Sequence, residues 1–404
     1  MQELDTFHTG TKGKVLALSL KAGLLTVLTL GLYRFWMKTR LRRYYWSAIR
    51  PGGVPLEYVG RPTEKLLGFL TAVVILAFYI GVVNLILMFF SFAYLDGEAS
   101  AYILSFLGLV PFIFFAQYRS RRYVFARSRW RGIRFGLEPG VMGYIWRAML
   151  YWTLTIVSLG LLWPLKRFRL EKYWTDRTLF GTEHFHQGGS WTMLIRPMLP
   201  LYIGAVMMVG SFVGLAVALE APDEGAAAMP FLVGGIVAGG ILAAIGLAHW
   251  RVGSYKRMME AKSVAGMGFD CNPSTASVIG IYLVGIIAIN LLVGALGLFF
   301  AAISAVMGWL ISPEIFVNGE MNLEAIIALP SWLLTVLGLM AYFAIFLIGD
   351  SLREVFFTLP VAKHFAENTR LVRVEKLDRI HQRERDDFSE AEGFADALPL
   401  GGGF

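Results

Sequence analysis

Arginine and aromatic side chains are concentrated at four places in this sequence, each after a hydrophobic run. The first is Leu30–Trp46, LGLYRFWMKTRLRRYYW. Its spacing, R-x-x-x-Y, occurs at Arg40–Tyr44, Arg119–Tyr123, Arg169–Tyr173 and Arg251–Tyr255. Arginine offers a fork of donors that fits phosphate, and Tyr and Trp settle at headgroup depth in a membrane. These four stretches, which we call collars, predict contact with phospholipid headgroups or another phosphate-bearing ligand.

The candidate binding residues are the cations and rings of the collars. The second collar is the most basic, because Tyr118–Gly140 carries seven arginines and no lysine. The candidates are Arg40, Arg42, Arg43, Tyr44, Trp46, Arg119, Arg121, Arg122, Tyr123, Arg169, Tyr173, Arg251 and Tyr255. A simpler interpretation is a topology signal with an aromatic belt, which membrane proteins commonly carry. Only the repeated R-x-x-x-Y spacing is more than such a topology signal requires.

Four polar side chains lie inside apolar runs, where a polar group usually faces a partner or water. They are Lys21, Asn84, Arg147 and Asn290. One interpretation makes Lys21 and Arg147 anion-contacting groups in a polar vestibule. The other is that both snorkel to a nearby interface.

The only cluster that resembles a metal site is Glu183-His184-Phe185-His186. An extended backbone would place both imidazoles on one face, but zinc takes three or four ligands and the other histidines show no ligand spacing. No H-E-x-x-H, G-x-S-x-G, phosphate-loop or G-x-G-x-x-G motif occurs. We therefore expect no metal and no cofactor. The missing motifs do not exclude catalysis, but no motif argues for it. In a membrane enzyme, Glu183, His184 and His186 would be the groups to test.

Composition places the chain among membrane proteins. Of 404 residues, 56% are hydrophobic and 16% are charged, which is too little charge for a soluble globule of this length. The net charge of +8 comes from cations beside apolar runs. Collars separated by membrane spans cannot form one groove, so we expect no nucleic-acid binding. The single cysteine, Cys271, excludes an internal disulfide, and no removable signal peptide is expected because the first run ends in RFWMKTR.

Six runs are long enough to cross about 30 Å of hydrocarbon as helices. They are Leu66–Leu95, Tyr102–Gln117, Arg196–Leu219, Met229–Trp250, Thr275–Ile311 and Ala325–Gly349. The sequence therefore predicts an all-α, polytopic membrane protein in which these runs form three helical hairpins.

Charge predicts the sidedness of the connections, because short cytoplasmic loops keep Lys and Arg. Three turns carry acids and no Lys or Arg: Asp96–Ser100, Glu220–Ala228 and Ser312–Glu324. Four connections are basic: Arg34–Lys65, Tyr118–Gly140, Lys166–Ser190 and Arg251–Ser274. We expect the basic connections and both termini to be cytoplasmic.

Two further apolar runs, Val15–Tyr33 and Val141–Pro164, are basic at both ends. A simple crossing would leave one cationic end outside the cell. The alternative is that each run breaks near Gly31 or Gly160 and re-enters, or lies in the interface. The sequence leaves re-entrant, interfacial and crossing arrangements open.

Internal repeats of about 130 residues are expected from recurring segments. The pattern L-G-L occurs in LTLGL at Leu28–Leu32, VSLGL at Val157–Leu161 and GALGL at Gly294–Leu298. An aromatic near a glycine precedes each one, at Phe7, Phe135 and Phe269. The third copy lacks a collar, which predicts fusion with the next helix.

These repeats predict membrane repeats at 1–134, 135–268 and a divergent 269–366, followed by a charged cytoplasmic tail at 367–404. The charges after Glu367 favour a solvated helix in the tail. The segment Glu390–Phe404 is expected to dock on the collars.

The stretches TLGLYRFWMKTRLRRYYW, PLEYVGRPTEKLLGFL and YRSRRYVFARSRWRGIRFG, and the ending RERDDFSEAEGFADALPLGGGF, resemble the YjgN-like family of bacterial inner-membrane proteins. The resemblance spans essentially the whole chain. It implies an integral membrane location and supplies no established activity. In the family a proline-tryptophan and a basic box usually follow L-G-L, whereas FFAAISAVMGWL follows Leu298 here.

These observations predict a multi-pass, non-enzymatic protein of the bacterial inner membrane whose collars contact anionic phospholipid or a phosphate-bearing ligand. The alternative is a solute transporter or channel with a polar site near the broken apolar segments. A homo-oligomer is compatible with the sequence, which does not fix the oligomeric state.

Overall fold

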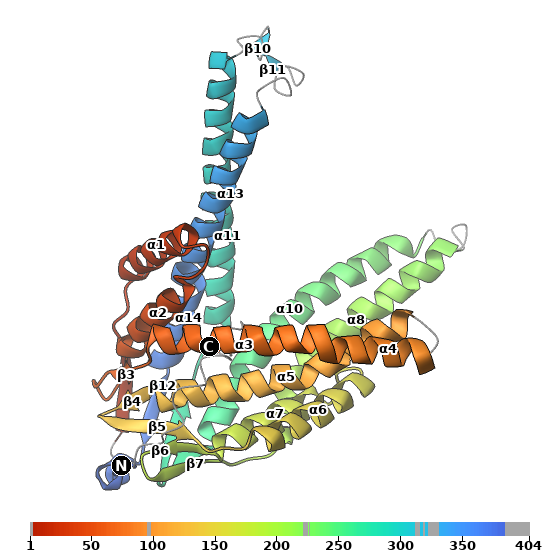
Figure 1. Ribbon diagram of the computed structural model, residues 1–404. Helices are drawn as coiled ribbons and strands as arrows, with labels where there is room; N and C mark the ends of the chain where they lie inside the picture. The colour runs from red at the N-terminus through yellow and green to blue at the C-terminus, as the bar shows by residue number, and fades with distance from the viewer. Residues whose placement is uncertain are drawn as a thin grey trace. The chain divides into compact units, whose positions relative to one another are not determined.

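The computed structural model describes residues 3–94, 98–220, 225, 227–311, 316–317, 320–321 and 331–383. They form two compact parts. One part holds the described residues of 3–9, 46–279 and 364–383, and the other holds those of 10–45 and 280–363. Most described residues are helical, as predicted (Figure 1). The all-α prediction is nevertheless wrong, because strands from the ends of the basic connections pair into an extended sheet.

Within the described residues, six helical segments are long and apolar enough to cross a membrane, and they match the six predicted runs. These segments are Pro62–Tyr94, Ile103–Ala126, Trp191–Glu220, Met229–Glu260, Thr275–Met307 and Thr335–Glu367. They indicate a membrane protein. The three acidic turns fall mainly on residues outside the described ranges.

The helices and helical turns have the following bounds. They are α1 (Lys12–Leu28), α2 (Arg34–Ala48), α3 (Pro62–Phe78), η1 (Tyr79–Val83), α4 (Asn84–Tyr94), α5 (Glu98–Ala126), α6 (Val141–Val157), α7 (Trp163–Thr175), η2 (Trp191–Leu194), α8 (Ile195–Glu220), α10 (Met229–Glu260), α11 (Thr275–Ile311), α13 (Ser331–Arg353), η4 (Glu354–Thr358), α14 (Leu359–Glu367) and η5 (Val374–Arg379).

Ten of the described strands form one antiparallel sheet, in the order β2-β1-β12-β9-β8-β7-β6-β5-β4-β3. The strands are β1 (Glu3–His8), β2 (Ile49–Pro51), β3 (Leu56–Tyr58), β4 (Ser128–Trp130), β5 (Ile133–Leu137), β6 (Thr178–Phe180), β7 (Glu183–Gln187), β8 (Lys262–Val264), β9 (Met267–Cys271) and β12 (Thr369–Val372). The two edge strands, β2 and β3, follow each other in the chain after a four-residue turn and lie close together. We call it the rolled sheet, because its edges meet. A separate pair, β10 (Phe316–Val317) and β11 (Glu320–Met321), forms a small hairpin.

The rolled sheet shows a unit that the sequence interpretation missed: a strand, two helical arms and a second strand paired with the first. It occurs five times, as β1/β2, β3/β4, β5/β6, β7/β8 and β9/β12, each pair enclosing its helices. The first and third units hold short arms, whereas the other three hold the long apolar helices. The proposed 130-residue repeat would therefore combine one short and one long unit, and the third copy holds only a long one.

One of the hydrophobic cores of the described residues lies on one side of the rolled sheet. Trp130, Phe180, Met267 and Leu371 meet in it from four different strands. Alternation explains the pattern, because every second residue of a strand faces the same side: Ile133 and Phe135 on β5 pack against this core.

The C-terminal segment contributes to the same core, which corrects the prediction of a solvated helix after Glu367. The chain forms β12 and then η5, and Val374, Leu377 and Ile380 are only 6%, 6% and 5% exposed. Residues three apart share a face of a 3₁₀-helix, so this spacing buries all three side chains. The predicted docking segment Glu390–Phe404 lies outside the described residues.

The two uncertain apolar runs each form a helix, a tight turn and a second helix. The first breaks at Leu30 and Gly31, with φ of 50° and 93°, and the second at Leu159 and Gly160, with φ of 50° and 89°. The third L-G-L segment lies inside the continuous helix α11, as the fusion prediction required.

Candidate functional site

The candidate site is the set of collars, and the structure divides each collar between internal and exposed groups. In every strand–helix–helix–strand unit, one residue lies five positions before the second strand. Its side chain contacts the backbone near the start of the first helical arm. These residues are Tyr44, Tyr123, Tyr173, Arg257 and His364. We call these contacts base clips, because each closes the base of a helical hairpin.

Three base clips are collar tyrosines. The Tyr44 hydroxyl accepts the Thr11 N–H at 2.8 Å, and the Tyr173 hydroxyl donates to the Gly140 carbonyl at 2.7 Å. The Tyr123 hydroxyl lies 3.4 Å from the Arg61 carbonyl and donates to Glu64 Oε2 at 3.0 Å. Thr11, Arg61 and Gly140 are the N-cap residues of α1, α3 and α6. All three hydroxyls contact a backbone atom of the N-cap residue of the first arm, which explains the spacing of Tyr in these collars.

The other two base clips use different chemistry. Arg257 donates to the Met193 carbonyl, and His364 Nε2 accepts the Ser274 N–H at 3.0 Å. Tyr255 lies two residues before the clip position, and its ring packs edge-on against Phe365 at 4.6 Å. The fourth R-x-x-x-Y is therefore out of register with the other three.

Four candidate collar arginines, by contrast, are exposed: Arg40, Arg43, Arg169 and Arg251. The Arg40 guanidinium lies 5.4 Å from the centre of the Tyr33 ring. Arg119, half-buried, lies 5.3 Å from the Phe115 ring. Arg42 is half-buried and Arg43 is exposed on α2.

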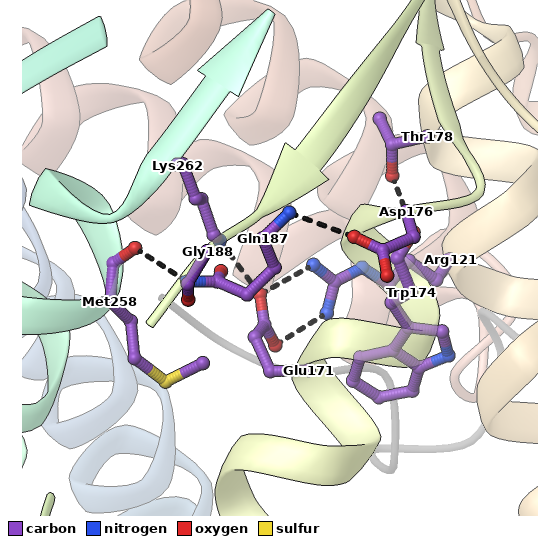
Figure 2. Close-up of polar contacts among 9 residues, drawn as sticks. All are labelled: Arg121, Glu171, Trp174, Asp176, Thr178, Gln187, Gly188, Met258 and Lys262. Atoms are coloured by element: carbon purple, nitrogen blue, oxygen red, sulfur yellow. Dashed lines mark hydrogen bonds and ion pairs between the residues drawn. The ribbon is translucent and has the colours of Figure 1, made fainter. Parts of the chain in front are cut away.

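The second collar is largely engaged inside the protein. The Arg121 guanidinium makes a two-pronged contact with Glu171, at 3.2 and 3.4 Å, and lies 4.2 Å from the Trp174 ring (Figure 2). Lys262 Nζ approaches the same carboxylate at 2.9 Å. Because Arg121, Glu171 and Lys262 come from α5, α7 and β8, this cluster joins the second, third and fourth units.

The charges around Glu171 stabilise its ionised form. Burial alone would raise the pKa of this carboxyl, but Arg121, Lys262 and Arg167 outweigh it and hold the pKa well below its usual range. Glu171 is therefore a carboxylate at neutral pH and a fixed counter-ion for two cations.

Backbone-directed contacts extend the cluster along β7. Asp176 accepts the Gln187 N–H at 2.8 Å, and the fully buried Gln187 side chain donates to the Met258 carbonyl at 3.1 Å (Figure 2). Lys172 donates to the Gln187 carbonyl at 2.7 Å. These contacts fix α7 and α10 against the rolled sheet.

Two more predicted ligand residues have internal roles. Arg122 is 8% exposed and its Nε donates to the Leu137 carbonyl at 3.1 Å. The Trp46 indole donates to Ser128 Oγ at 2.9 Å. Such contacts use donors that a headgroup would otherwise occupy.

Sequence reasoning missed the carboxylates that pair with the collars. Glu64 accepts from Tyr123 and from Arg127 at 3.0 Å each, and Glu354 accepts from Tyr45 at 2.8 Å. One signal was available: Glu171 is the sole acid in the third collar, RFRLEKYW. Glu64 and Glu354 are distant in sequence from their partners, so only folding joins them.

The four polar residues of the apolar runs make local contacts. Arg147 donates to the Gly143 carbonyl at 2.9 Å, and Asn290 donates to the Ile286 carbonyl at 2.8 Å, each one turn back on its own helix. Asn84 Nδ2 lies 3.9 Å from Met88 Sδ, and Lys21 is exposed on α1. The snorkelling and vestibule interpretations both stay predictions.

The His-x-His stretch forms β7, with both imidazoles exposed and Phe185 packed against the core. His184 lies 3.7 Å from Glu138, and His186 lies 3.7 Å from Asp176. Among the described residues, no group of three or more His, Cys, Asp and Glu side chains could hold a metal ion.

The family described as "Bacterial protein of unknown function (DUF898)" matches residues 3–397. The chain belongs to this family. The recognition based on the collar motifs is thereby confirmed, and a bacterial membrane protein of unknown function is the coarse identity that follows. Comparisons with curated proteins and with solved structures give no match.

Proposed function

We propose that this protein is a non-enzymatic, multi-pass component of the bacterial inner membrane that binds anionic phospholipid headgroups through its exposed collar arginines. One observation carries the proposal: Arg40 and Arg169 are exposed one helical turn before the clip tyrosines Tyr44 and Tyr173. Four residues of α-helix span about 6 Å, so each guanidinium lies that much farther from its following strand than the tyrosine. Arginine then faces the membrane interface while tyrosine holds the hairpin base.

The rolled sheet supports placing all collars on the same side of the membrane. Strands that follow the four collars, β2, β4, β6 and β8, belong to it. A bilayer cannot pass through a hydrogen-bonded sheet, and basic connections favour the cytoplasmic face. Pairing of β1 with β12 supports cytoplasmic positions for both ends of the chain.

The proposed division into repeats 1–134, 135–268 and 269–366, with a tail at 367–404, describes ancestry rather than folding units. It is supported by the alternation of short and long strand–helix–helix–strand units in the first two copies.

Native mass spectrometry of the full-length protein tests the lipid proposal. The variant Arg40→Gln/Arg169→Gln/Arg251→Gln should retain severalfold less phosphatidylglycerol and cardiolipin than the wild type, because three exposed collar guanidinium groups are gone. The matched control is Arg373→Gln/Lys376→Gln/Arg379→Gln, which removes three exposed cations from η5 and its N-cap, outside the collars. It should keep the lipid.

Equal lipid retention in the two triple variants would refute the proposal. Displacement of the bound lipid by millimolar inorganic phosphate would point to a soluble phosphate-bearing ligand instead. The alternative of a solute transporter with a site near the broken segments has less support, because Arg147 and Asn290 each donate to a carbonyl of their own helix.

A further inference from the structure

We propose that the two short hairpins, α1–α2 and α6–α7, are wedges that enter a single leaflet and contact its acyl chains through their Leu-Gly-Leu tips. This inference rests on the membrane location in the proposed function and adds the part of the lipid that the hairpins meet. It also chooses among the crossing, re-entrant and interfacial arrangements that the sequence left open.

The two hairpins have the same internal geometry. Each tip leucine, Leu30 or Leu159, comes 19 residues after the N-cap of the first arm, Thr11 or Gly140. Each clip tyrosine comes 33 residues after the same N-cap. The second arm therefore returns beside the first in both hairpins, and α1 cannot cross the membrane unless α2 crosses it too.

Every backbone N–H from Thr29 to Arg34 and from Ser158 to Trp163 is paired within its hairpin. Gly31 donates to Thr26 and Gly160 donates to Thr155, at 2.7 and 2.8 Å. The Thr29 and Ser158 hydroxyls accept the N–H groups of Tyr33 and Leu162. The remaining paired N–H groups are those of Thr29, Leu30, Leu32, Arg34, Ser158, Leu159, Leu161 and Trp163. Hydrocarbon offers no partner to an unpaired N–H, so these turns are suited to enter it.

The side chains at the tips are apolar and uncovered. Leu30 is 96% exposed and Leu159 is 94% exposed, and the flanking Leu32 and Leu161 are 57% and 64% exposed. Burial of a leucine side chain in an apolar environment is favourable. Two leucine-lined tips of identical geometry are therefore best matched by the acyl-chain region.

Charges on the second arms limit the depth of insertion. Arg34, the first residue of α2, is exposed and can extend its long side chain toward the headgroups. Lys38 and Arg40 lie four and six residues into α2, and Arg167 and Arg169 lie four and six residues into α7. At 1.5 Å per residue, these cations are about 6 and 9 Å from the start of their arms. A leaflet contributes about 15 Å of hydrocarbon, so the tips end inside it when the cations stay at the headgroups.

A full crossing would bury these cations. The α2 helix carries five Lys and Arg among its 15 residues, and a charge at mid-bilayer depth is costly. In α7, Lys166 Nζ lies 3.3 Å from the Trp152 ring centre and 4.6 Å from that of Trp163. The two indoles suit an interfacial position.

Neighbouring spans agree with insertion at this depth. The Tyr202 hydroxyl contacts the tip carbonyls of Gly160 and Leu161, at 3.0 and 2.8 Å, from within the candidate span Trp191–Glu220. In the α1–α2 hairpin, Gly23 of α1 packs against Leu347 in the candidate span Thr335–Glu367. Each hairpin thus lies against a helix that can cross the membrane.

Spin-label accessibility in the full-length protein, reconstituted in vesicles of phosphatidylethanolamine and phosphatidylglycerol, tests the wedge. Labels are attached at Leu30→Cys and Leu159→Cys, where the native side chains make few contacts. The native Cys271 is 0% exposed and burial raises its pKa, so the parent chain provides the background. The tip labels should collide with oxygen far more than with the water-soluble nickel complex, at a depth within one leaflet.

The label at Lys376→Cys, exposed on η5 and outside the collars, gives the aqueous reference. Nickel accessibility at Leu30→Cys and Leu159→Cys equal to that reference would overturn the proposal. Reaction of these cysteines with an impermeant maleimide added outside intact cells would overturn it as well, because it would indicate crossing. If the tips remain inserted in the triple arginine variant that has lost no lipid, the headgroup proposal fails and the wedge stands.

Discussion

The three L-G-L segments of this protein adopt two different structures. At Leu30–Leu32 and Leu159–Leu161 the chain reverses, whereas Leu296–Leu298 continues within the 37-residue helix α11. The residue before L-G-L is Thr29 or Ser158 in the reversing copies, and its hydroxyl accepts an N–H four residues later. In the straight copy it is Ala295, which has no hydroxyl and favours helix.

This difference teaches that glycine permits the reversal but does not cause it. Gly297 is tolerated in a helix at a cost of about 1 kcal/mol. A reversal also needs a cap for the new helix, a second arm that ends in a charged collar and a clip at the base. Helix α11 instead continues into FFAA, whose apolar side chains remain in an apolar segment.

The largest expected effect on stability is at Glu171, near the base of the α6–α7 hairpin. The Glu171→Gln variant leaves Arg121 and Lys262 without their counter-ion, which should lower the free energy of unfolding by about 3 kcal/mol. Apparent melting temperature in one detergent, followed by fluorescence, measures the loss. Glu260→Gln is the control, because Glu260 makes an exposed pair with Lys256 in the same helix, worth about 0.5 kcal/mol or less.

The same variant changes the dependence of stability on pH. The pKa of Glu171 is lower in the folded protein than in the unfolded chain, so its contribution is present above the unfolded value and is lost as the pH falls. Below about pH 5 the wild type should lose stability progressively as the pH falls, and should lose more of it than Glu171→Gln. Parallel losses in the two proteins would show that Glu171 is not held as a carboxylate.

Alanine substitutions at Gly160 and at Gly297 should have intermediate effects on the free energy of unfolding, and the two effects should have opposite signs. Gly160→Ala puts a side chain at φ of +89°, which should cost about 1–2 kcal/mol. Gly297→Ala, inside α11, should gain up to about 1 kcal/mol from helix propensity. An added Cβ meets no atom within 4 Å at either site, so the backbone alone decides the sign. Melting shifts in the same direction would contradict this account.

The smallest expected effect concerns the hydroxyl cap. Ser158→Ala removes the acceptor of the Leu162 N–H and should cost about 1 kcal/mol. Ser304→Ala is the control, since Ser304 in α11 only donates to the Phe300 carbonyl one turn back. The pair can be compared by melting temperature and by spin-label mobility at Leu159→Cys. Equal behaviour of the two variants would remove the cap from the explanation.

Much of the fold could be predicted from apolar runs and charges. Six predicted runs match six helical segments, and the breaks at Gly31 and Gly160 were expected as one alternative. The sheet was missed because its strands are three to six residues long and are separated by hairpins of up to about a hundred residues. Alternation at Ile133–Phe135 and Met267–Phe269 was visible, but so short a pattern does not specify a partner.

The sequence by itself determined where apolar helices end and where arginine and tyrosine gather, because hydrophobicity and charge act locally. Only the tertiary structure decided which of these groups remain available. Arg121 and Arg122 became internal when Glu171 and the Leu137 carbonyl were brought to them, whereas Arg40 and Arg169 stayed exposed. The physical reason is that a buried guanidinium must find its partners through long-range strand pairing, which no local pattern encodes.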